Sequence, residues 1–385
     1  MATSFKTLKP EDIQTTRTNL HEAIPVTGSI VSGTYVSAGN EFNIKNYTHG
    51  MFQSVYDFPY LSSSANHIFD ITAGLASNSS LSGALCTQVD QKMQMYNELA
   101  QVLVGHDVTG TIEQFDEDGN FASATDKMKE CVFFNVARLL TKDELKKGSF
   151  SMIFNVDPHA TPTSSALVKQ VVISDQSGSN GFKVNSPAGE YGILFASGSS
   201  STLGLGGTIM AGGQQPACGL LFYQAGVVVL TGSLFKVQQS GGLLDNTVVD
   251  SSGSAGKIQM RPNNSTLTAG DDGIDNLLKL TTISSSADAM RQRLNDLSFN
   301  NTTELNSTVY FCRANSKEFN YSSNPTYLSQ SQIRTKETRT DEPISYATTV
   351  GLYGENNELL AVAKLSEPLK KTPANEFTLR VRLDY

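Results

Sequence analysis

Apolar residues in this chain occur in many short runs separated by turn-forming residues, and few segments repeat them at helical spacing. Runs of this kind at Cys131–Leu140, Ser149–Val156 and Val168–Ser174 are rich in Val, Ile and Phe, side chains that pack well on a pleated strand. Glycine, serine, asparagine and aspartate bound them, as is typical of short strands. We therefore predict a mainly β fold with a few α-helices, a β-rich α+β protein with antiparallel sheets.

The clearest helical period lies within Leu85–Val104, where apolar side chains recur at spacings of three and four. The stripe that we expect to be buried comprises Val89, Met93, Tyr96, Leu99 and Leu103. Two shorter helices are also predicted. One starts at Ser286 as N-cap and continues through Leu297, and the other covers Lys142–Lys147 before Gly148.

The C-terminal segment predicts three strands joined by two turns. Ile344–Tyr353 and Leu359–Leu365 flank the first turn, and the second turn lies within Glu367–Glu376. In the final strand, apolar and polar side chains alternate strictly, which is the period of a half-buried strand. Its apolar row comprises Phe377, Leu379, Val381 and Leu383. This pattern predicts a C-terminal three-stranded antiparallel meander.

A chain of 385 residues is long enough for two or three domains. Polar, turn-rich passages near Thr163, Gly241 and Asn300 suggest where these domains meet. We predict an N-terminal α+β domain at 1–163 and a Gly/Ser-rich β region at 164–240, followed by a polar insertion with a helix at 241–300 and a C-terminal β domain at 301–385.

The charge balance argues against a nucleic-acid partner. Lys and Arg total 29 against 37 Asp and Glu, for a net charge of −8, and no basic block occurs along the chain. The longest apolar run, near Ala225–Leu230, is far shorter than a membrane span. The N-terminus lacks the apolar core of a signal peptide, so we expect synthesis in a cytoplasm. The four cysteines have no paired spacing and are expected to be free thiols.

Motifs that carry chemistry are missing from the sequence. No glycine-rich loop is followed by Lys-Ser/Thr, and the five histidines never occur in the paired spacing of a zinc site. Ser233–Lys236 matches Ser-x-x-Lys but lacks the motifs that accompany it in penicillin-binding enzymes. Asp116–Asn120 is interpreted as a solvated hairpin turn between strands at Val108–Phe115 and Phe121. We predict no catalytic residue, no cofactor and no metal, and we expect the protein not to be an enzyme.

Two segments are candidate subunit interfaces. Gly50–Asn66 is dense in aromatic residues and too irregular for one helix or strand, so it is either a loop that plugs the core or a subunit contact. Its candidate residues are Phe52, Tyr56, Phe58 and Tyr60. The second candidate is the apolar row of the last strand, Phe377, Leu379, Val381 and Leu383, which either docks on a partner or completes its own domain.

Four phrases of the sequence resemble virion structural proteins of contractile-tailed bacteriophages (myoviruses), especially those of cyanobacterial hosts. They are SVYDFPYLSSSAN at Ser54–Asn66, GLLFYQAGVVVL at Gly219–Leu230, EFNYSSNPTY at Glu318–Tyr327, and TVGLY at Thr349–Tyr353 together with LLAVAKL at Leu359–Leu365. The last pattern also resembles a module of phage tail-fibre and collar proteins.

The resemblance implies a virion protein of the tail, built into a symmetric assembly by other tail or baseplate proteins and by self-association. A baseplate wedge component is the first expectation, and a neck or collar protein is the alternative. From a different class, a receptor-binding or adhesin-like β protein would show a similar polar composition. A hydrolase with a dispersed site is the third hypothesis.

Overall fold

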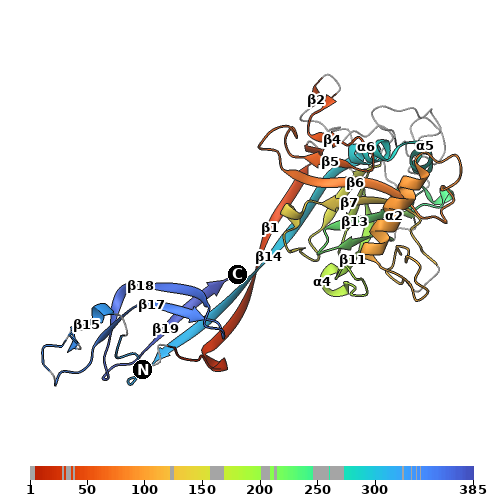
Figure 1. The fold of residues 1–385 in the computed structure, drawn as a ribbon. Coiled ribbons are helices and arrows are strands. Elements are labelled where there is room, and N and C mark those ends of the chain that lie inside the picture. Colours follow the sequence, from red (N-terminus) through yellow and green to blue (C-terminus); the bar gives the residue numbers. More distant parts are fainter. Residues whose placement is uncertain are drawn as a thin grey trace. The chain divides into compact units, whose positions relative to one another are not determined.

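The computed structural model describes residues 5–27, 30–31, 36–37, 40–121, 125–156, 169–200, 209–211, 215–245, 260, 273–322, 325–330, 332–334, 336–338 and 340–385. The chain divides into two compact units, which are described separately. The smaller unit comprises Met1–Leu20 and Glu304–Tyr385, and the larger unit comprises His21–Thr303. Strands β1 (Ile13–Thr27) and β14 (Leu294–Ala314) contribute residues to both (Figure 1). The predicted mainly β character is confirmed.

One antiparallel sheet organises the larger unit. Among the described residues its strands follow the order β14-β9-β10-β11-β12-β13-β7-β6-β5-β4, and β8 also pairs with β14. The strands are β4 (Ile44–Asn46), β5 (Gln53–Tyr56), β6 (His67–Leu75), β7 (Glu130–Val136), β8 (Glu144–Leu145), β9 (Ser151–Asn155), β10 (Lys169–Ser174), β11 (Tyr191–Ser200), β12 (Ala217–Phe222) and β13 (Val227–Thr231). A separate short hairpin joins β2 (Val36–Ser37) and β3 (Asn40–Glu41).

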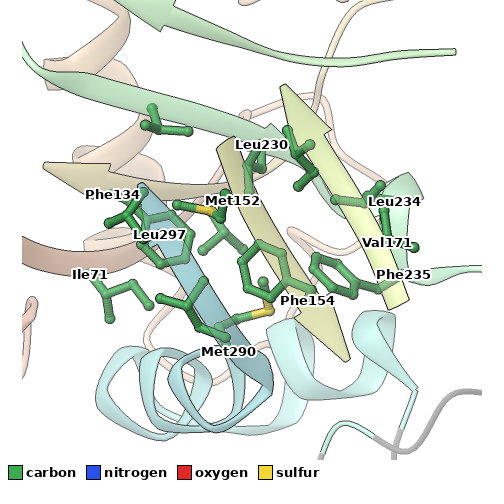
Figure 2. Packing of buried hydrophobic residues seen from close by; sticks show 14 of the residues in the cluster. Ile71, Phe134, Met152, Phe154, Val171, Leu230, Leu234, Phe235, Met290 and Leu297 are labelled. Atoms are coloured by element: carbon green, nitrogen blue, oxygen red, sulfur yellow. The ribbon is translucent and has the colours of Figure 1, made fainter. Parts of the chain in front are cut away.

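The central strands of this sheet are mostly apolar because both faces are covered. Every residue of β13 is buried. Phe133 and Phe134 on β7 point to opposite faces, since successive side chains of a strand alternate. Phe133 packs in the cluster that contains Tyr96 of the helix α2 (Val89–Leu103). Phe134 packs in the cluster that contains Met290 of the helix α6 (Ile283–Arg293), as Figure 2 shows.

The remaining helices are short. They are α3 (Arg138–Thr141), α4 (Gly178–Gly181) and α5 (Ile274–Leu280), with 3-10 turns at Pro10–Asp12, Gly232–Phe235, Gln238–Ser240 and Pro325–Tyr327. Thr282 caps α6, because its side chain accepts a hydrogen bond from the backbone N–H of Ser285. α5 ends at Leu280 and α6 begins at Ile283, so the two helices follow each other closely. Both pack in the same core cluster, α5 through Leu277 and Leu278 and α6 through Met290.

The helix predicted at Leu85–Val104 exists, but it begins at Val89. Tyr96 and Leu103 of the predicted stripe are buried, while its other three members are only half-buried. Lys92, which does not belong to the predicted stripe, is fully buried. Its ammonium donates to the carbonyl oxygens of Leu278 (2.5 Å) and Thr281 (2.7 Å), so it satisfies backbone acceptors at the end of α5.

Three local predictions were wrong. Residues 142–147 contain β8 instead of a helix, because α3 ends at Thr141 and Asp143 N–H already bonds to Thr302. The helix expected from Ser286 to Leu297 stops at Arg293, and its last apolar positions belong to β14. The strands expected around Asp116–Asn120 are reduced to isolated bridges.

In the smaller unit, β17 (Ser345–Tyr353) and β18 (Leu359–Lys371) form a two-stranded antiparallel hairpin. The final strand, β19 (Phe377–Asp384), pairs with β14, so the predicted three-stranded meander is wrong. The register of β18 on β17 shifts between Ala347 and Thr349, and β18 contains Pro368, which has no N–H to donate. The end of β14 instead offers an unbroken row of partners, from Ser307 opposite Asp384 to Ala314 opposite Phe377. A further short hairpin joins β15 (Leu328–Ser329) and β16 (Gln332–Ile333).

The predicted four-domain division stays a prediction, since compactness alone does not show which segments fold by themselves. Its boundary near Asn300 lies close to the junction between the two units at Thr303 and Glu304. Thr163 and, within the predicted insertion at 241–300, residues 246–259 and 261–272 lie outside the described residues.

Candidate functional site

The aromatic phrase of the sequence forms a closed loop in the larger unit, the 57–66 loop. Asp57 N–H donates to the carbonyl oxygen of Asn66 at 3.1 Å. In return, Asn66 donates its backbone N–H to Oδ1 of Asp57 at 2.6 Å and its amide Nδ2 to Oδ2 at 2.8 Å. Three hydrogen bonds between two residues hold the ends of the loop together. The loop follows β5 directly and leads into β6, so its base stands on the central sheet.

This loop exposes apolar side chains at its surface. Leu61 is 85 % exposed and Phe58 is 48 % exposed, and Tyr60 is also exposed. Tyr60 N–H donates to the carbonyl oxygen of Phe42 at 3.0 Å, which places a second exposed aromatic residue beside the loop. Apolar side chains gathered in this way are typical of an interaction surface. We call Phe42, Phe58, Tyr60 and Leu61 the loop patch.

The four predicted residues of this segment fall into two groups. Phe58 and Tyr60 are exposed, whereas Phe52 and Tyr56 are half-buried. The Tyr56 ring lies 5.4 Å from His67 and 6.3 Å from Tyr60, between centroids, so it connects the loop to the start of β6. Leu61 was not among the predicted interface residues, although the three consecutive serines that follow it indicated that it has no apolar neighbour on that side.

The predicted apolar row of the last strand lies on the covered side of β19. Val381 is buried and the other three members of the row, Phe377, Leu379 and Leu383, are half-buried, while the residues between them are exposed. Val381 lies opposite Tyr310 of β14. The smaller unit thus covers much of this row itself, which supports the interpretation that the row completes its own packing. A role as a docking surface stays a prediction.

The hairpin β17–β18 exposes apolar residues that were not among the predicted interface residues. Leu359, Leu360, Val362 and Tyr353 are all exposed. The Phe5 ring meets the Tyr353 ring edge-on, with 4.8 Å between centroids. The signal in the sequence was the unbroken apolar run from Leu359 to Ala363, because a half-buried strand would alternate.

No group of His, Cys, Asp and Glu suited to holding a metal ion occurs in the described part of the chain. All four cysteines are free, and burial raises the pKa of the Cys131 and Cys218 thiols well above the ordinary value. These buried thiols are therefore protonated at neutral pH and poorly nucleophilic.

The acidic turn around Asp116 differs from the solvated turn that was predicted. Asp116 is fully buried, and its carboxylate lies 3.4 Å from the Lys127 ammonium, which also pairs with Glu113 at 3.0 Å. Burial raises the pKa of Asp116 to about 6 and that of Glu117 to about 7. One lysine thus joins two segments of an otherwise irregular stretch, which is a structural role.

No helix within the described ranges is long and apolar enough to cross a membrane. Comparisons with models of protein families, with curated proteins and with solved structures find no match.

Proposed function

We propose that this protein is a non-enzymatic structural subunit of a bacteriophage contractile tail, and within the tail a component of the baseplate wedge. The observation that carries the proposal is the 57–66 loop, a clamped loop that stands on the central sheet and exposes Phe58, Tyr60 and Leu61. The same loop lies within Ser54–Asn66, one of the phrases that resemble virion proteins.

The shape of this loop suits assembly by packing. The Asp57–Asn66 clamp holds the ends in place before binding, which reduces the conformational entropy lost when a partner docks. Phe, Tyr and Leu side chains supply apolar area worth about 25 cal/mol for each Å² removed from water. A permanent neighbour in a particle covers such a surface, as in obligate interfaces that resemble a domain core cut in half. A neck or collar subunit would use the surface in the same way, so particle labelling has to distinguish the two positions.

The double substitution Phe58→Ser and Leu61→Ser tests the loop. Both side chains are exposed, so we expect unfolding stability to change by about 0.5 kcal/mol or less per site. We expect incorporation into particles to fall about tenfold or more, since truncating a hot-spot residue of an interface costs about 2 kcal/mol or more of binding, roughly a factor of 30. Supplying the variant in trans to a phage that lacks the gene, followed by immunoblotting of purified particles, measures the incorporation.

The matched control is Val108→Ser with Val184→Ser, which removes two exposed apolar side chains from other loops of the same unit. This control should enter particles normally. Equal incorporation of the loop variant and the control would show that the loop patch is not an assembly surface.

A further inference from the structure

Asp116 and Lys127 lie directly opposite each other in an isolated antiparallel bridge of the larger unit. Glu117 and Met128, the residues that follow them, donate their backbone N–H groups across the bridge at 3.0 and 2.9 Å. An antiparallel pair whose neighbours carry the backbone hydrogen bonds brings its own two side chains closer together than a hydrogen-bonded pair does. The backbone therefore holds an amine and a carboxyl group side by side.

The Asp116 carboxyl group is buried and only partly satisfied. Its Oδ1 accepts a hydrogen bond from the backbone N–H of Asp118 at 3.1 Å. Its Oδ2 has no hydrogen-bond partner in the described part of the chain, although Nζ of Lys127 lies 3.4 Å away. Burial, together with a hydrogen bond to the Asp118 carboxylate, raises the pKa of Asp116 to about 6. The neutral acid is therefore accessible near neutral pH.

The Lys127 nitrogen is fixed by two other acceptors. The side chain is 10 % exposed, and Nζ donates to the carbonyl oxygen of Phe121 at 2.7 Å and to Oε1 of Glu113 at 3.0 Å. An ammonium group has three N–H donors, and the neutral amine has two N–H donors and a lone pair. Once one proton has left, the two acceptors occupy both N–H groups. The lone pair remains for the third neighbour, the Asp116 carboxyl group.

We propose that Lys127 and Asp116 condense to form an isopeptide bond between Nζ and Cγ. The ammonium first passes a proton to the Asp116 carboxylate, and the free amine then attacks Cγ. Glu113 takes the next proton from the nitrogen and returns it to the hydroxyl group, which leaves as water when its bond to Cγ breaks. One ammonium and one carboxylate thus become one amide and one water molecule, and the condensation requires no other reactant.

The surroundings of the pair favour condensation over a lasting ion pair. Phe115 and Tyr191 are buried in the cluster beside the pair, and the Phe121 ring lies 5.8 Å from Nζ and 5.8 Å from the Tyr191 ring, between centroids. Such a site disfavours the charged forms, and two groups held in contact react as if they were highly concentrated. A charge-assisted hydrogen bond would instead shorten to about 2.7–2.9 Å.

The bond would stabilise a stretch that has little regular structure. Between α2 and β7, the described residues contain isolated bridges and turns, and no strand. A covalent link from Asp116 to Lys127 would replace the backbone ladder that this stretch lacks. The inference rests on these side chains alone, so it holds whether or not the protein belongs to a phage tail.

Intact-mass spectrometry of the denatured full-length protein tests for the bond. The unmodified chain should be lighter than its sequence mass by one water molecule. Lys127→Arg keeps the positive charge but removes the amine that condenses, so this variant should show its full sequence mass. An unmodified chain that shows its full sequence mass would overturn the proposal, and this measurement depends on no substitution.

Proteolysis identifies the linked residues. A protease that cleaves after glutamate separates Asp116 from Lys127 by cutting after Glu117, and the fragments 114–117 and 118–130 should nevertheless stay joined. A succinimide at Asp118-Gly119 would lose the same mass but would leave these fragments separate. Separate fragments would therefore overturn the proposal even if the mass of one water molecule were missing.

Glu113→Gln tests the proton transfer, because glutamine can still accept a hydrogen bond from Nζ but cannot carry the proton. The rate at which linked chain accumulates after synthesis should fall about tenfold or more. Glu98→Gln, the same change at an exposed position on α2, is the control and should leave the rate unchanged. Linkage of Glu113→Gln as fast as the control would overturn the role given to Glu113.

Discussion

Replacing Phe154 with alanine is expected to lower the free energy of unfolding by about 3–5 kcal/mol, the usual cost of deleting a buried aromatic ring and leaving a cavity. Phe154 on β9 is fully buried. Its ring centroid lies 5.9 Å from that of Phe134 and 5.3 Å from that of Phe235, which it meets nearly at right angles (Figure 2). These neighbours come from β7 and from the 3-10 turn after β13, so the cavity would weaken contacts between separate parts of the larger unit.

Urea unfolding followed by far-ultraviolet circular dichroism measures this loss. Phe58→Ala is the control, since it deletes the same ring from an exposed position and should change stability by about 0.5 kcal/mol or less. If Phe154→Ala and Phe58→Ala unfolded at the same urea concentration, Phe154 would not lie in the core as described.

The second large effect concerns a buried guanidinium. Arg291 of α6 is fully buried, and its Nη2 pairs with the carboxylates of Glu41, at 2.5 Å, and Asp288. Its Nε donates to Oε1 of Gln53 at 3.1 Å, and its Nη1 donates to the carbonyl oxygen of Val31 at 2.8 Å. We expect Arg291→Met to cost about 3–5 kcal/mol of stability, because it removes the positive charge that two largely buried carboxylates share and a donor to a buried carbonyl.

A compensated variant separates the loss of charge balance from the loss of packing. Adding Glu41→Gln and Asp288→Asn to Arg291→Met removes the stranded charges, so part of the stability should return in the same urea measurement. The explanation would be wrong if Arg291→Met were as stable as the parent chain, or if the two added substitutions lowered its stability further.

Most strands were predictable because their residues carry local signals. The β-branched and aromatic runs at β7, β9, β12 and β13 specify buried strands wherever they pack. The partner of a strand was less predictable, because the alternating row of β19 could pair with any open sheet edge. β19 pairs with β14, which offers an unbroken row of partners, and not with β18. Helical spacing of apolar residues also gave a wrong prediction where the spacing continued into a strand, since Leu294 and Leu297 belong to β14.

The candidate surfaces were predictable only in part, because exposure is a property of the whole fold. The aromatic phrase at Gly50–Asn66 was visible in the sequence, but which of its rings face water depends on the Asp57–Asn66 clamp. The burial of Lys92 was not predictable from its neighbours in the sequence. Its ammonium is buried because it donates to carbonyl groups at the end of α5, far away along the chain.

The central claim, that this chain is a subunit of a phage baseplate, is tested most directly by mass spectrometry and immunogold electron microscopy of particles purified from a culture that expresses the gene. The account predicts that the protein is present in every intact particle and that the label lies at the baseplate end of the contractile tail. Particles that lack the protein while it accumulates unassembled in the infected cell would contradict the account.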